Sequence, residues 1–226
     1  MNSNEEKDFY NSLSFPNLTS VILNNCKFKC YDAFERFFSN LSDTENTIKL
    51  LAINRLNSVV SAKGFGRFLL TQLESLESLT LNGVHKNILS RKYHKKVLPI
   101  LAQMPNLRHL SLSKNQLDFA RLQSIVSQMT SESFQELQTI DLSQNLMENN
   151  GVLCLYKMLK GRYVSAETVD VSGNRINEEG LNLFLKGKIH LGEAPLARGL
   201  IANQMIEKNY IVNNPKGSKL ERLELS

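Results

Sequence analysis

The sequence predicts an α/β fold in which short strands alternate with amphipathic helices. Two observations predict it: a strand-like pattern recurs about every 30 residues, and the stretches between its copies carry apolar residues at helical spacing. The chain has 226 residues, of which 42% are hydrophobic and 22% are charged. This is the ordinary balance of a globular protein, and it excludes a chain that is disordered along its whole length.

The repeated pattern has the form LxxLxLxxNxL and is clearest in two segments, 107–117 and 137–147. Weaker copies begin at Leu18, Ile48, Leu76 and Ala166, and a truncated copy begins at Leu220. The first positions of the six longer copies are separated by 28 to 31 residues. A period of this length leaves room for a helix after each strand.

Helices are predicted between the strands because two sets of apolar residues have helical spacing. They are Phe119, Leu122, Ile125, Val126 and Met129 in one stretch, and Val152, Leu155, Tyr156 and Leu159 in the next. Asp118 and the segment 148–150 carry residue types that begin helices. A further helix is predicted over 194–209, followed by a loop over 213–218.

These strand and helix signals together resemble the leucine-rich-repeat family, and the long period resembles its ribonuclease-inhibitor-like subclass. The resemblance covers residues 18–185 and the last seven residues. It implies a horseshoe-shaped solenoid with a parallel concave β-sheet and convex helices. It also implies four regions: an N-terminal flanking helix or cap over 1–17, six repeats over 18–187, a degenerate or inserted segment 188–219, and the start of a further truncated repeat over 220–226. Because the chain stops inside a strand pattern, we expect it to be part of a longer protein.

Each position of the pattern has a physical role. In a strand of period two, Leu110 and Leu112 point into the core, whereas His109, Ser111 and Ser113 point to the open face. The recurring asparagines are expected to bond backbone groups of the turn that leaves each strand. They are Asn115, Asn145 and Asn174, and Cys26 takes the same position in the first copy. A structural role is therefore favoured for the Cys26 thiol over a reactive one.

Some positions depart from the pattern. Leu56 and Val84 replace the asparagine in the second and third copies, so irregular turns are predicted there. Asn46 lies outside the pattern and is expected to be exposed.

The open face of the predicted sheet supplies the candidate binding residues. Most of its side chains are small or polar, which is typical of a surface that binds through many modest contacts and a few anchors. Arg108, Asp141 and Asp170 are the expected anchors. The full set of candidates is Asn24, Asn54, Thr80, Asn82, Arg108, His109, Ser111, Gln138, Asp141 and Asp170.

Charge is distributed unevenly along the chain, whose formal net charge is +5. Residues 78–117 hold seven cations and no Asp or Glu, whereas 132–179 hold eight acids and four cations. A basic patch is predicted at Lys86, Arg91, Lys92, Lys95 and Lys96. A solvated helix start is the favoured interpretation of this patch, over contact with nucleic acid, phospholipid or an acidic protein.

Signals of catalysis are scarce. The sequence contains no GxxxxGK[ST] and no HExxH, and none of its four histidines has a Cys or His partner at metal-ligand spacing. We therefore expect no catalytic residues, no metal site and no cofactor. His109 lacks a neighbouring nucleophile, so it is expected to contact a partner rather than to act as a general base.

A cytoplasmic location is expected. The three cysteines are too few and odd in number for a disulfide framework, which favours free thiols. The sequence as given begins without a secretory signal and has no apolar run of the length that spans a membrane.

The function expected from these features is a non-enzymatic scaffold that binds a protein partner on the concave sheet. The family resemblance leaves alternatives open, because related repeats also occur in GTPase-activating proteins, in actin-regulatory proteins and in host-directed bacterial effectors. These alternatives rest on fold analogy, since no residue here matches a catalytic arginine motif.

Overall fold

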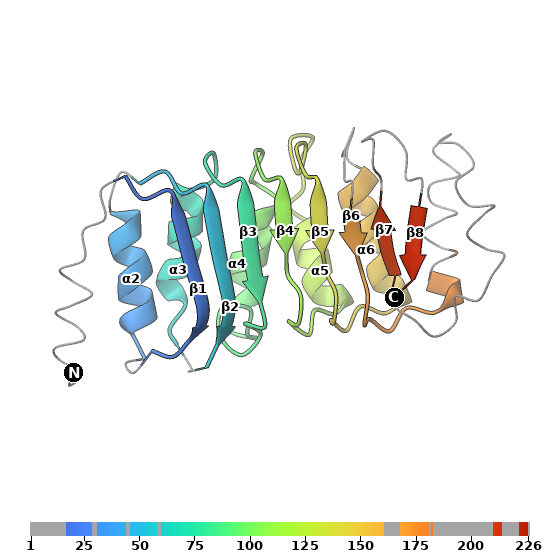
Figure 1. The fold of residues 1–226 in the computed structure, drawn as a ribbon, viewed down its shortest axis with the longest axis horizontal. Coiled ribbons are helices and arrows are strands. Elements are labelled where there is room, and N and C mark those ends of the chain that lie inside the picture. The colour runs from blue at the N-terminus through green and yellow to red at the C-terminus, as the bar shows by residue number, and fades with distance from the viewer. Residues whose placement is uncertain are drawn as a thin grey trace.

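Strands that follow one another in the chain lie side by side in one sheet (Figure 1). The structure is a computed structural model, and it describes residues 17–28, 31–43, 46–57, 60–160, 168–180, 182, 210–213 and 222–225. These residues form an eight-stranded sheet whose spatial order is the chain order. The predicted helix over 194–209 and the predicted region boundaries near 17 and 188 lie at or outside the limits of the described residues.

The first six strands are parallel, which confirms the predicted α/β class. They are β1 Ser20–Cys26, β2 Leu50–Leu56, β3 Ser78–Asn82, β4 His109–Ser111, β5 Thr139–Asp141 and β6 Thr168–Asp170. Strand β7, Tyr210–Asn213, pairs antiparallel with β6, and β8, Arg222–Leu225, pairs antiparallel with β7. Strand β8 falls within the last predicted copy of the pattern, but β7 separates it from the parallel strands.

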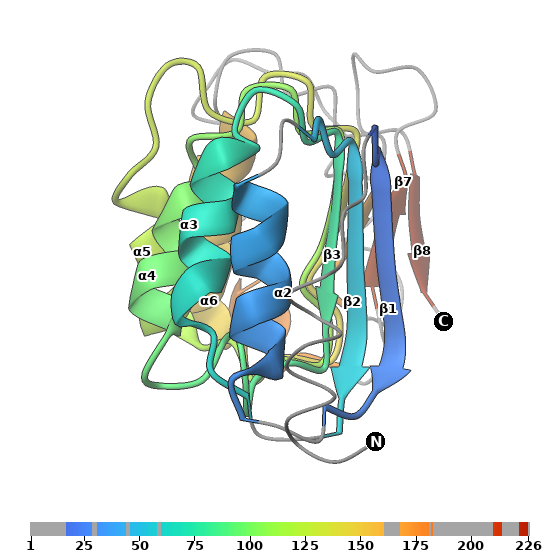
Figure 2. The ribbon, with the colours of Figure 1, turned by 90° about the vertical axis from the view of Figure 1, so that its left-hand side faces the viewer.

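Helices cover one face of the sheet and leave the opposite face open (Figure 2). They are α2 Ala33–Ser42, α3 Lys63–Thr71, α4 His94–Leu101, α5 Phe119–Val126 and α6 Asn149–Lys160. Each packs beside the helix that follows it in the chain. Helix α5 begins after Asp118 as predicted, because the Asp118 carboxylate accepts the Arg121 N–H at 3.0 Å. Helix α6 begins within the predicted start at 148–150.

The core lies between the sheet and the helices, and it contains the apolar positions of the repeated pattern. Leu110 and Leu112 are fully buried, as the period of two predicts. Burying a side chain of this size contributes about 1.5–3 kcal/mol relative to exposure. Under the first strands the core is aromatic: Phe38 lies 4.9 Å from both Phe65 and Phe68, measured between ring centroids.

The recurring asparagines connect neighbouring turns, which confirms their predicted role. The Asn145 side-chain oxygen accepts the N–H groups of Asn115 and Leu117 at 2.9 and 3.0 Å. Its amide group donates to the carbonyls of Leu112 and Leu142 at 3.0 and 2.9 Å. Asn115 accepts the Val84 N–H, and Asn174 accepts the Met147 N–H, so the same bond pattern recurs along the sheet. Buried backbone groups of the turns are satisfied in this way.

A residue in the left-handed region occupies the same position in every repeat, at the end of β1 and β2 and just after β3 to β6. The six φ values lie between 53° and 65°. The residues are Asn25, Arg55, Gly83, Lys114, Gln144 and Gly173. The left-handed residue is therefore kept in the second and third repeats, for which irregular turns are predicted, and residues 58–59 of the turn after β2 lie outside the described residues. In the second repeat, Leu56 stands where the asparagine would be. The Asn87 amide of the next repeat donates to the Leu56 carbonyl at 3.1 Å and so supplies one hydrogen bond between the two repeats.

Asn46 is buried rather than exposed, with 6% of its surface accessible. Its side-chain oxygen accepts the Leu18 N–H at 2.8 Å, 28 residues earlier in the chain. The expectation of exposure was wrong because this contact depends on the packing of two successive repeats, which the local sequence around Asn46 does not reveal.

Candidate interaction surface

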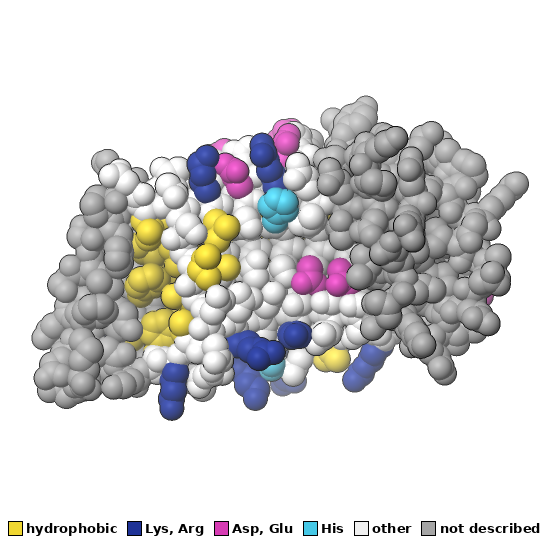
Figure 3. Space-filling view, in the orientation of Figure 1, with side chains coloured by type: hydrophobic (Ala, Val, Ile, Leu, Met, Phe, Trp, Pro, Cys, Tyr) yellow, Lys and Arg dark blue, Asp and Glu magenta, His cyan; other side chains and the backbone are white. Residues whose placement is uncertain are grey.

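The open face of the sheet presents side chains from all six parallel strands (Figure 3). One row of residues is aligned by the strand register, so its members are neighbours although they are about 30 residues apart in the chain. The row is Ile22, Ala52, Thr80, Ser111, Asp141 and Asp170. It changes from apolar at β1, where Ile22 is 57% exposed, to acidic at β5 and β6.

A second row carries amides and hydroxyls just before the left-handed turn residues. Asn54 donates to the Asn24 side-chain oxygen at 2.8 Å. The Asn82 side-chain oxygen accepts the Ser113 N–H at 2.9 Å and lies 2.8 Å from the Ser111 hydroxyl. These polar side chains hold one another in defined orientations, so the surface is ordered before any partner binds.

Two carboxylates stand side by side on the open face, because Asp141 and Asp170 are register partners on β5 and β6 (Figure 3). Each accepts the N–H of the serine two residues later, from Ser143 at 2.9 Å and from Ser172 at 2.8 Å. The Ser111 hydroxyl lies 2.7 Å from the second Asp141 oxygen. Within the described part of the chain, no cation forms an ion pair with either carboxylate.

Charged residues line the edge where the strands begin. The Lys49 ammonium lies 3.1 Å from the Glu77 carboxylate on the neighbouring repeat. Hydrogen bonding to Lys49, together with the charges of Lys49 and Arg108, holds the pKa of Glu77 below its usual range. Arg108 and Gln138 precede β4 and β5, so they border the open face, whereas His109 lies on it with Nδ1 2.9 Å from the Thr139 hydroxyl.

The basic patch lies elsewhere, in the turns after β3 and the first turn of α4. Its five side chains are exposed. The Lys92 ammonium stands 5.2 Å from the Tyr93 ring centroid, and a hydrogen bond with Tyr93 raises the pKa of Lys92. The structure therefore gathers the predicted open-face residues on the sheet and its starting edge, and keeps the predicted basic residues apart from them.

Arg55 and Lys114 were missed by sequence reasoning. Both occupy the left-handed position, directly after Asn54 and Ser113 of the amide and hydroxyl row. Comparing this one position across the repeats would have found them, because it holds a cation at the end of β2 and again after β4.

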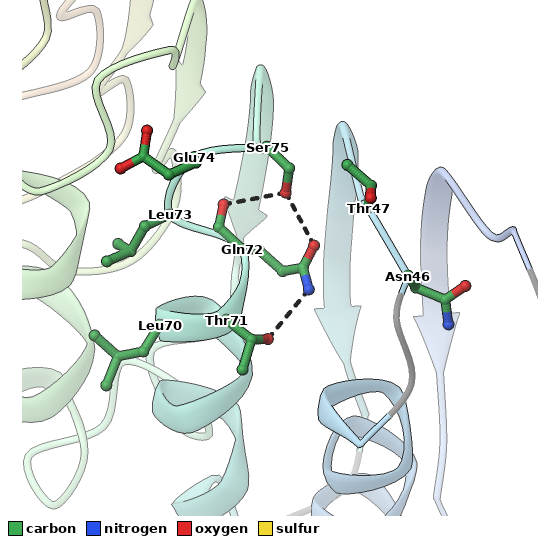
Figure 4. Close-up of a pocket in the computed structure, with 8 residues that line it drawn as sticks. All are labelled: Asn46, Thr47, Leu70, Thr71, Gln72, Leu73, Glu74 and Ser75. Carbon is green, nitrogen blue, oxygen red and sulfur yellow. Dashed lines mark hydrogen bonds between the residues drawn. The ribbon is translucent and has the colours of Figure 1, made fainter.

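A shallow hollow of ≈ 250 Å³ lies at the end of α3 (Figure 4). Its lining residues are Asn46, Thr47, Leu70, Thr71, Gln72, Leu73, Glu74 and Ser75. Gln72 accepts the Ile48 N–H at 2.8 Å and the Ser75 hydroxyl at 3.0 Å, and its amide donates to Thr71. The polar groups of the hollow thus hold the chain together where α3 ends and do not converge on its centre.

Two thiols, Cys26 and Cys154, lie among the described residues. Burial raises the pKa of the Cys154 thiol, and Cys26 is half-buried with its sulfur 3.6 Å from the Asn24 carbonyl. In the described part of the chain, no three His, Cys, Asp or Glu side chains are close enough to hold a metal ion. None of the helices described there has the length and apolar composition needed to cross a membrane.

Comparison of the chain with protein-family models and with curated proteins finds no match.

Proposed function

We propose that the chain is a leucine-rich-repeat protein of the ribonuclease-inhibitor-like subclass, built as a solenoid with a concave sheet. Three observations support this proposal. Each repeat contains a parallel strand, and a helix follows each of the first five. The turn asparagines bond between neighbouring repeats. A left-handed residue recurs at one position of all six repeats, at or just after the end of each parallel strand.

Within this framework, the protein is a non-enzymatic interaction module that binds a protein partner on the open sheet face. The observation that carries the proposal is the continuous face of six strands in register, with side chains that are already hydrogen-bonded to one another. At about 4.8 Å per strand, the face extends roughly 24 Å across the parallel strands. Ordered side chains lose little entropy on binding, so modest contacts over such a face add up to useful affinity.

The anchors in this proposal are charged side chains at and near β4 to β6. Arg108 is exposed at the border of the face, and Asp141 and Asp170 present two adjacent carboxylates without a cationic partner in the described residues. Free thiols at Cys26 and Cys154 support a cytoplasmic site of action.

The experiment that tests the proposal combines capture with site-specific cross-linking. A photoreactive residue at Thr80 on the open face is compared with one at Leu153, which is exposed on helix α6. We expect one protein to cross-link to the Thr80 probe, and the double variant R108E/D141K to lose it while its circular dichroism spectrum stays native. Its melting temperature should fall only modestly, because Asp141 accepts the Ser143 N–H and lies 2.7 Å from the Ser111 hydroxyl.

Reversal of Lys92, Lys95 and Lys96 provides the comparison. These residues lie off the open face, so their reversal is expected to slow association of the same partner without abolishing it. The open face is not the binding site if the partner cross-links only at Leu153. The same conclusion follows if R108E/D141K still captures the partner and the lysine-reversal variant does not.

A further inference from the structure

Cations gather at the edge of the sheet where the parallel strands end. Arg55 lies at the end of β2 and Lys114 follows β4, both in the left-handed position, and Lys86 lies in the turn after β3 between them. We define the basic rim as Arg55, Lys86, Arg91, Lys92 and Lys114, all of which are exposed. A lower band of Lys and Arg side chains is visible along this edge in Figure 3.

Contacts between the turns bring these residues together. A Cβ added to Gly83 would lie 3.4 Å from Arg55 Cγ, so the Arg55 side chain crosses beside the turn after β3. The Gly83 N–H donates to the Ser113 carbonyl at 3.0 Å, directly before Lys114. The turn that carries Lys86 is thus held between Arg55 and Lys114.

The charges of the basic rim are not neutralised nearby. Among the described residues, no carboxylate forms an ion pair with any of its five cations. Three exposed acids directly precede helices at the same edge, Asp32 before α2, Asp118 before α5 and Glu148 before α6, and Glu148 lies beyond the rim, after β5. The Asp118 carboxylate is already used, since it accepts the Arg121 N–H at the start of α5.

Two exposed aromatic side chains flank the basic rim. Tyr31 follows β1 and is 48% exposed, and Phe119 begins α5 after β4 and is 42% exposed. The Tyr31 hydroxyl lies 3.3 Å from the Tyr93 hydroxyl, beside Lys92. In strand order, the edge therefore presents an aromatic ring, a row of cations and a second aromatic ring.

We propose that the basic rim docks the protein on an anionic lipid membrane. Lysine and arginine bind the phosphates and carboxylates of lipid headgroups, and aromatic rings are stable in the headgroup region beside them. The edge consists of the ends of four successive strands at a spacing of about 4.8 Å, so it offers a row roughly 15 Å long to a planar surface. The open sheet face stands beside this edge and stays free for a protein partner (Figure 2).

The rim is less suited to nucleic acid. Amides that read bases must be free, but Asn57 donates to Asn25 at 2.6 Å and Gln116 is bonded to His85 at 3.1 Å. The Tyr93 ring is buried and faces Lys92, so it offers no stacking platform.

The test measures sedimentation of the full chain with phosphatidylcholine vesicles that contain or lack phosphatidylserine. The rim variant R55Q/K114Q is designed to preserve the fold, because Gln144 occupies the equivalent left-handed position after β5. Its matched control, R67Q/K157Q, removes two exposed cations from helices α3 and α6, at least one turn after each helix begins.

We expect wild-type protein to bind the anionic vesicles and to be released by salt. Each cation at an anionic surface changes the partition coefficient about fivefold, so R55Q/K114Q should bind about 25-fold more weakly. The control should bind within about twofold of wild type, because its charges are distant from the contact. Phe119→Ser should weaken binding several-fold without changing the salt dependence.

Several outcomes would overturn the proposal. They are equal binding to vesicles with and without phosphatidylserine, equal losses in the rim variant and its control, and binding of a single-stranded oligonucleotide in place of vesicles. A rim variant with a native melting temperature that loses vesicles but keeps the protein partner supports membrane docking and leaves the open-face proposal intact. Loss of the partner alone, with vesicle binding unchanged, contradicts docking by the rim.

Discussion

At the scale of single residues, the fold depends on side chains that complete hydrogen bonds between turns. Asn145 makes bonds to backbone groups of the preceding repeat and of its own repeat, and it is buried. A shorter side chain at this position leaves several backbone groups without partners and without access to water. Each lost hydrogen bond lowers stability, because the buried backbone group has given up its contact with water and no longer has a partner in the protein.

Asn145→Ala is therefore expected to lower the free energy of unfolding by about 1–3 kcal/mol. Asn46→Ala should also destabilise, by about 1 kcal/mol, since its oxygen accepts the Leu18 N–H. Asn150→Ala is the control, because Asn150 is exposed on α6, and its effect should stay within about 0.5 kcal/mol. Urea denaturation of the three variants checks this order, and equal midpoints for Asn145→Ala and Asn150→Ala would contradict the structural role of the turn asparagines.

Two glycines should respond in opposite directions to the same substitution. Gly83 has a φ of 65°, so Gly83→Ala places a Cβ in the left-handed region and should cost about 1 kcal/mol. Gly66 lies inside α3, and an added Cβ would meet Ile100 at an ordinary 3.6 Å. Gly66→Ala should therefore stabilise by about 0.5–1 kcal/mol. Thermal unfolding of both variants tests the assignment, and melting temperatures that shift in the same direction would contradict it.

At the scale of elements, cross-strand contacts align each repeat with the next. The Lys49–Glu77 ion pair spans the residues just before β2 and β3 and is supported by Arg108 before β4. The pair is exposed, so it contributes little to stability. The contacts among Lys49, Glu77 and Arg108 do depend on strand register, because these three residues occupy the same position in successive repeats.

We expect Lys49→Gln to raise the pKa of Glu77 toward its usual value, and Arg108→Gln to raise it less, since Lys49 is the larger cause of the lowering. A carboxyl whose pKa is lowered by folding stabilises the protein above its unfolded pKa. This contribution is lost as the pH falls through the folded pKa. Titration of the Glu77 side chain by NMR measures both shifts, and a larger effect from Arg108→Gln would show that the repeats are aligned differently.

At the scale of the whole molecule, strands contact neighbouring strands and helices contact neighbouring helices. Stability in such an arrangement is approximately a sum of repeat and nearest-neighbour terms. The phenylalanine cluster under the first repeats is a local source of that stability, because Phe65 packs between Phe34, Phe38 and Phe68.

Phe65→Ala is expected to destabilise the first repeats by about 3–5 kcal/mol. Hydrogen exchange should become faster at Val21 and Leu51 than at Ile140, because the cavity lies under β1 and β2 and its effect weakens with distance along the sheet. Leu137→Ala, in a fully buried position beside β5, is the matched change at the other end and should reverse the pattern. Uniform loss of protection in either variant would indicate a single cooperative unit.

Local sequence determined the features that depend on spacing along the chain. The alternation of strand and helix, the burial of Leu110 and Leu112, the helix start at Asp118 and the role of Asn145 all follow from short-range patterns. These predictions succeeded because the period of a strand or helix decides which side of the element a residue occupies.

Only the tertiary structure decided which residues from different repeats become neighbours. The burial of Asn46, the adjacency of Asp141 and Asp170, and the gathering of Arg55, Lys86 and Lys114 at one edge depend on contacts between residues roughly 30 positions apart. The physical reason is that strand register aligns equivalent positions of successive repeats, and packing between repeats then determines which of these side chains stay in contact with water.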